Sequence, residues 1–163
     1  MARKYFAANG ASPTTAAQVA VTTGTAIKTL LQVATPSTTG LSIIEWGISF
    51  DGSAAATPIK VELLQTDVAA TVTSLTPTLW GDNNTLASLC VGGTTATGYT
   101  ATAEGTITAT IMFDVQFIAP TSQYKWAWPF QREPKVLASK FLRVRVTAGT
   151  AVNAYCFVVW EED

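Results

Sequence analysis

The feature that most constrains the fold of this chain is a period-two alternation of apolar and polar side chains. Its longest stretch is 106–117, where the odd positions from Ile107 to Phe117 are apolar and the even positions, apart from Met112, are polar. Successive side chains of a β-strand point to opposite faces of the sheet. This stretch therefore predicts a long strand whose odd-numbered face lies on a core.

Similar short runs, separated by Gly, Pro, Asp and Ser, recur over the rest of the chain, whereas helical periodicity is hard to find. Within one of them, Ile44, Trp46, Ile48 and Phe50 share a predicted face. The predicted strands lie at 18–22, 26–33, 41–50, 59–64, 106–117, 124–130, 142–147 and 152–160. The pattern between 75 and 105 is irregular and predicts long loops, with a short helix at 86–90.

About eight strands with turn signals between them predict an all-β fold. We expect a single antiparallel β-sandwich, or a jelly-roll-like variant of it, at 16–163. The small and polar residues before it predict an extended N-terminal arm at 1–15. No apolar signal-peptide core follows Arg3 and Lys4, and no apolar run reaches the length of a membrane span, so we expect a protein made in the cytoplasm and not bound to membranes.

The composition argues against catalysis. The chain has no histidine, so neither a Ser-His-Asp nor a Cys-His arrangement can be built, and two cysteines do not supply a zinc site. Phosphate-binding glycine motifs are missing, and the net charge of −1 gives no nucleic-acid signal. We therefore expect no enzyme activity, no cofactor and no specific nucleic acid. Only 13% of the residues are charged, which favours a surface that another protein covers.

Three weaker possibilities remain open. Paired carboxylates can hydrolyse glycosides, although solvated surface carboxylates are the favoured interpretation. The candidates are Glu45, Asp51, Glu62, Asp67, Asp82, Glu104 and Asp114. A calcium site at 82–84 (Asp-Asn-Asn) competes with a simple turn, which is favoured. A disulfide between Cys90 and Cys156 is also less favoured than two free thiols.

An aromatic stripe stands out near the C-terminal third. Tyr124, Trp126, Trp128 and Phe130 alternate, so in a strand all four rings lie on one face. Such a stripe is typical of a core, of a subunit interface or of a platform for sugar rings. We carry it forward as a candidate oligomer or partner interface.

Basic residues form the second candidate surface. Most of them gather in one short part of the chain, where Arg143 and Arg145 share a strand face: Lys125, Arg132, Lys135, Lys140, Arg143 and Arg145. They form either a positive strip that grips an acidic protein or an ordinary solvated face. Arg3, Lys4, Tyr5 and Phe6 are a comparable candidate on the predicted arm, where an aromatic pair either docks on a neighbour or frays.

Three segments resemble a known group of proteins. They are 45–53 (EWGISFDGS), 98–106 (GYTATAEGT) and 140–146 (KFLRVRV), the last continuing to Trp160. Together they resemble small head-associated proteins of tailed bacteriophages that infect actinobacteria, over most of the chain from about Ala16 onward.

The resemblance implies a virion protein, and among virion proteins a capsid decoration (cement) protein on the outer capsid surface. Its partner would be the major capsid protein, and it would form a homo-oligomer, with a trimer favoured. The capsid contacts would come from Arg3, Lys4, Tyr5, Phe6, Arg132, Lys135, Lys140, Arg143 and Arg145. A carbohydrate-binding module on the virion surface and a tail or connector protein are the alternatives.

Overall fold

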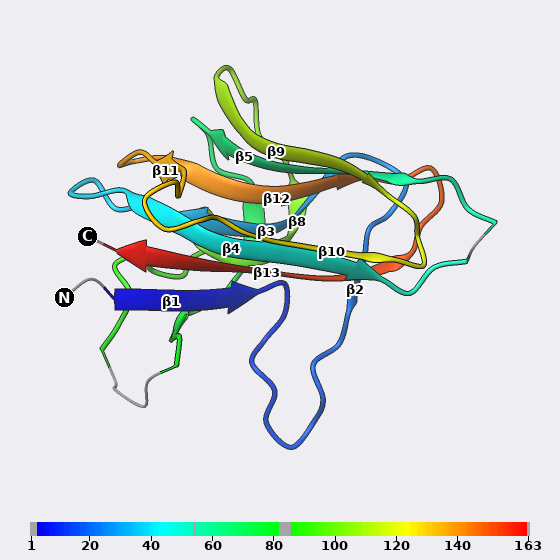
Figure 1. The fold of residues 1–163 in the computed structure, drawn as a ribbon, viewed down its shortest axis with the longest axis horizontal. Coiled ribbons are helices and arrows are strands. Elements are labelled where there is room, and N and C mark those ends of the chain that lie inside the picture. The colour runs from blue at the N-terminus through cyan, green and yellow to red at the C-terminus, as the bar shows by residue number, and fades with distance from the viewer. Residues whose placement is uncertain (1–2, 54, 82–85, 163) are drawn as a thin grey trace.

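The computed structural model describes residues 3–53, 55–81 and 86–162, which form thirteen strands in two sheets. The named strands pair in antiparallel fashion and the sheets lie face to face as a β-sandwich (Figure 1). The predicted all-β sandwich is confirmed. The helix predicted at 86–90 is wrong, because those residues follow an irregular path. Within the described ranges no helix is long and apolar enough to cross a membrane.

The first sheet has the strand order β10-β4-β13-β1-β7, with β11 also paired to β4 and β2 also paired to β13. Its two longest strands, β4 and β13, pair from Ala154 opposite Phe50 to Glu162 opposite Leu41. The bounds are β1 (Arg3–Ala8), β2 (Val21–Thr22), β4 (Leu41–Phe50), β7 (Thr78–Leu79), β10 (Gln123–Ala127), β11 (Lys135–Val136) and β13 (Asn153–Glu162).

The second sheet has the order β6-β8-β3-β12-β5-β9. Its centre is β12, which pairs with β3 on one side and β5 on the other. The bounds are β3 (Lys28–Ala34), β5 (Ile59–Thr66), β6 (Thr71–Ser74), β8 (Gly98–Ala103), β9 (Thr110–Ile118) and β12 (Phe141–Thr147).

The core lies between the two sheets. Trp46 and Trp160 are its largest side chains, and both are completely buried. Trp46, Ile48 and Phe50 point inward as predicted, but a register shift opposite 43–45 turns Ile43 rather than Ile44 into the core. Burying each such side chain adds roughly 1.5–3 kcal/mol to the free energy of unfolding. The packing between the two sheets is therefore the main source of stability.

The predicted N-terminal arm is wrong for its first part. Residues 3–8 are β1, inserted between β13 and β7, with Tyr5 and Ala7 buried. Asn9 continues the attachment, since its side chain donates to Ala154 O and accepts from Cys156 N, both at 2.9 Å. Only the exposed residues 11–17 resemble the expected arm, and Figure 1 shows this segment inside a loop below the sandwich.

Candidate functional site

The candidate site is one open edge of the sandwich. β9 ends the second sheet and β10 ends the first, and the two strands are consecutive in the chain. An edge strand leaves backbone N–H and C=O groups unpaired, which makes it a template for association with another chain.

Exposed apolar side chains concentrate at this edge. Of the thirteen large hydrophobic residues exposed in the described part of the chain, seven fall between 111 and 137. Three of them, on the outer face of β9, form what we call the β9 patch: Met112, Val115 and Phe117. Phe117 is the most exposed of the three, at 73%. Ile111 lies on the opposite face of β9, where it pairs with Gln65, and Leu137 lies close to it because its N–H donates to Gln65 Oε1.

The sequence placed only part of β9 correctly. Phe113 packs against the core as predicted, but Val115 and Phe117, also expected there, lie on the outer face opposite the charged residues Glu62 and Lys60. Asp114 instead faces inward, opposite the buried Leu63. A register shift between Leu63 and Leu64 changes the phase of the strand, and a period-two pattern does not specify which face is inside. The strand also starts at 110 rather than 106.

Three of the four stripe aromatics come together in a hollow that we call the edge groove. Its volume is about 320 Å³, and its lining is Phe113, Asp114, Gln116, Tyr124, Trp126 and Trp128. Tyr124 and Trp126 pair with the buried Ile48 and Trp46, so this part of the stripe faces inward, at the rim of the core. Phe130 lies beyond the end of β10 and is 85% exposed, so it does not share that face.

One end of the edge groove carries a hydrogen-bonded cluster. Tyr124 OH donates to Asp114 Oδ2 at 3.0 Å, and Gln116 Nε2 donates to Asp114 Oδ1 at 2.8 Å and to Tyr124 OH at 3.3 Å. Burial, followed by the hydrogen bond to Asp114, raises the pKa of Tyr124 to about 12. These contacts explain how Asp114 and Gln116 tolerate an inward position.

The predicted basic strip is largely wrong. Arg143 is completely buried, and Arg145 is mostly buried with its Nε 2.8 Å from Glu62 Oε2. Lys125 points away from the groove, 3.4 Å from Glu45 and over the ring of Phe157 at 5.7 Å from its centre. Among the other predicted capsid contacts, Tyr5 is buried and Phe6 stacks between Trp80 and Phe157. Four remain exposed: Arg3, Lys4, Arg132 and Lys135.

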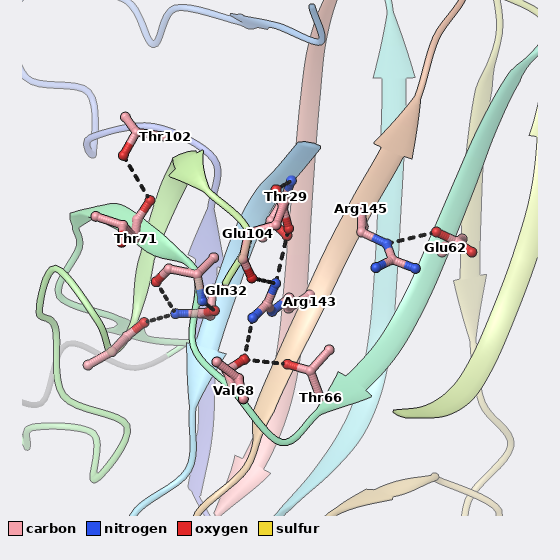
Figure 2. Close-up of polar contacts among 12 residues, drawn as sticks. Thr29, Gln32, Glu62, Thr66, Val68, Thr71, Thr102, Glu104, Arg143 and Arg145 are labelled. Atoms are coloured by element: carbon pink, nitrogen blue, oxygen red, sulfur yellow. Dashed lines mark hydrogen bonds and ion pairs between the residues drawn. The ribbon is translucent and has the colours of Figure 1, made fainter. Parts of the chain in front are cut away.

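The buried arginine is held by a network drawn in Figure 2. Arg143 Nη1 donates to Glu104 Oε2 and to Glu104 O, both at 3.0 Å, and Nη2 donates to Val68 O. Glu104 also accepts from the backbone and hydroxyl of Thr29, at 2.5 and 2.6 Å. Burial lowers the pKa of Arg143 while Glu104 opposes that shift. The alternation correctly placed Arg143 on the outer face, but the segments around 68 and 104 cover it.

The candidate carboxylates serve the fold. Asp67 accepts from the hydroxyl and amide of Thr108 and from Ala109 N, contacts that lower its pKa to about 2. Glu62 has a lowered pKa because its hydrogen bond and charge contact with Arg145, and then those with Lys60, outweigh burial. Asp82 and the 82–84 calcium candidate lie outside the described residues. In the part that is described, no three potential metal-ligand side chains gather.

Two further features concern the cysteines and the C-terminal strand. Cys90 and Cys156 are both free and buried, and burial raises both thiol pKa values. Sequence reasoning missed Glu162, whose buried carboxylate accepts from Ser88 Oγ, from Leu89 N at 2.9 Å and from Trp160 Nε1 at 3.0 Å. An acidic residue at the end of a strand gives no sequence signal for such a role.

In comparisons with known proteins, no family model matches the chain, and no curated protein or solved structure matches it.

Proposed function

We propose that this chain is a structural virion protein that decorates the outer surface of a bacteriophage capsid and stabilises the shell without catalysing a reaction. It would act as a homo-oligomer, with a trimer favoured by the resemblance to phage head-associated proteins. The observation that carries the proposal is the β9 patch, an apolar surface on a strand that pairs with β5 on one side and ends the second sheet on the other.

Soluble proteins usually protect an edge strand with charge, proline or a covering segment, because an exposed apolar edge promotes association. The register shift and the inward-facing Asp114 protect the backbone of β9 in part, but its outward-facing Met112, Val115 and Phe117 form an exposed apolar surface without charge. Covering them contributes about 25 cal/mol per Å² of apolar surface. We therefore place the contact between copies at the β9 patch.

The contact with the major capsid protein is assigned to exposed basic side chains. Arg3 and Lys4 lie at the start of β1, and Arg132 and Lys135 lie near β11. Each such contact would be weak, since exposed ion pairs contribute about 0–1 kcal/mol. Many copies on one shell act together, so the combined stabilisation of the capsid is large.

The test compares Phe117→Ser with Val19→Ser. Both changes place a hydroxyl at an exposed apolar position, but Val19, at 76% exposure, lies in the 11–20 loop, away from β9. We expect the wild type and Val19→Ser to have the mass of a defined oligomer by light scattering, and Phe117→Ser to be a monomer. Mixed with undecorated capsids, the oligomers should sediment with the shells and raise their melting temperature.

Two outcomes would overturn the proposal. If the wild type is a monomer and does not sediment with capsids, the chain is not a decoration protein. If Phe117→Ser keeps the wild-type mass, the β9 patch is not the contact between copies.

A further inference from the structure

We propose that the edge groove binds a neutral polysaccharide, with one pyranose ring seated against Trp126 and Trp128. This site is independent of the proposed contact through the β9 patch. Its volume, about 320 Å³, lies in the range of about 300–1,000 Å³ typical of small-molecule sites.

The two tryptophans that line the groove offer a flat apolar surface on which a sugar ring can stack. Trp126 and Trp128 lie on the inner face of the β10 segment, and Trp126 remains 46% exposed although its register partner Trp46 is completely buried. The ring face of an aromatic side chain carries negative charge density, which attracts the C–H groups on one side of a pyranose. The same ring also removes that apolar side of the sugar from water.

The polar end of the groove supplies the hydroxyl contacts. Asp114, Gln116 and Tyr124 are already oriented by three hydrogen bonds between them. Each carboxylate oxygen of Asp114 accepts only one of these bonds and has further lone-pair capacity, and Gln116 Oε1 accepts none of the three. Sugar hydroxyls can therefore donate to a rigid set of acceptors, at a low entropic cost.

Charge selects a neutral sugar over an acidic one. None of the six lining residues is basic, and Asp114 is the acidic one among them. Lys125, from the same strand, points to the opposite side and is held by Glu45 and Phe157. Asp114 would repel the negative charge of a uronic acid or a phosphorylated glycan. No basic residue of the lining offsets that repulsion.

The experiment measures retardation of the full chain in native gels that contain laminarin, yeast mannan or galactan, with polygalacturonate as the acidic probe. Trp126→Ala is compared with Trp80→Ala, a matched control because Trp80 is 47% exposed and lies outside the groove, just after β7. We expect at least one neutral polysaccharide, and not polygalacturonate, to retard the wild type and Trp80→Ala. Trp126→Ala should bind at least tenfold more weakly.

Asp114→Asn provides a second variant with the same shape, should Trp126→Ala unfold. Loss of a charged acceptor should weaken binding by about tenfold, with the circular dichroism spectrum unchanged. Light scattering of the same samples separates this site from the oligomer contact, because Trp126→Ala should keep the wild-type mass.

Three results would overturn the inference. The first is that no neutral polysaccharide retards the wild type. The second is that Trp80→Ala and Trp126→Ala lose binding equally. The third is that Trp126→Ala dissociates the oligomer while the wild type binds no sugar, which would assign the groove to a second copy of the chain.

Discussion

At the scale of single residues, Arg143 shows how a polar side chain on an outward strand face becomes buried. Its guanidinium reaches three oxygen atoms of Glu104 and Val68, while its Nε has no partner among the described residues. Removing one member of such a buried pair leaves the other desolvated and uncompensated. We therefore expect Arg143 to be a structural residue and not a capsid contact.

Arg143→Met should lower the free energy of unfolding by about 3 kcal/mol, because Glu104 then lacks its charged partner. Urea titration followed by tryptophan fluorescence measures the change. Lys125→Met, which breaks the exposed pair with Glu45, should cost less than about 1 kcal/mol. Arg143→Met combined with Glu104→Gln should recover part of the loss. If the free energy of unfolding of Arg143→Met lies within 1 kcal/mol of the wild-type value, Arg143 does not have this structural role.

At the scale of elements, the sequence identified the two long strands at the centre of the first sheet because their apolar residues recur on the face that lies on the core. The range 41–50 matches β4, and 152–160 nearly matches β13. β8 was missed because its Gly, Ala and Thr residues resemble linker sequence, and β1 was missed because its short run RKYFAA leads directly into small and polar residues. β9 was found, but its second half was inverted, since the inward position of Asp114 depends on Tyr124, which lies on another sheet.

The end of β13 also determines the position of an irregular segment. Glu162 holds Ser88 and Leu89, and Cys90 N donates to Ser88 Oγ at 3.0 Å. Two hydrogen bonds to one carboxylate, and a third to the hydroxyl of Ser88, thus replace regular structure in this part of the chain. No pattern in 86–91 indicates that contact, because its partner lies more than seventy residues away.

Glu162→Ala should release this segment and expose Cys90 to a thiol reagent such as dithionitrobenzoate. We expect labelling of Cys90 to accelerate about tenfold, because local opening becomes easier by roughly 1–3 kcal/mol. Cys156, buried in the middle of β13, is the internal control and should keep its slow rate. Single-cysteine variants assign the two rates. Equal acceleration of both thiols would indicate global destabilisation and contradict a local role for Glu162.

At the scale of the whole molecule, the two ends of the chain lie side by side. Arg3 pairs with Glu162, and β1 continues along β13 to Ala8 opposite Phe157 (Figure 1). The sequence predicted the β-sandwich correctly. It did not indicate that β9 is an edge strand, and therefore not that the apolar side chains of β9 are exposed. Edge position depends on the order of strands far apart in the chain, which local patterns do not encode.

The pairing of β1 with β13 predicts that the stability of the sandwich depends on β1. Tyr5 is 2% exposed, its ring lies 6.2 Å from that of Trp160, and its hydroxyl donates to Ala87 O at 3.2 Å. Tyr5→Ala should therefore cost about 3–5 kcal/mol of unfolding free energy in urea. Lys4→Ala, one residue away and exposed, should change it by less than about 0.5 kcal/mol. If Tyr5→Ala instead leaves stability within 1 kcal/mol of the wild type, residues 3–8 act as a detachable arm, and the sandwich folds without its N-terminal strand.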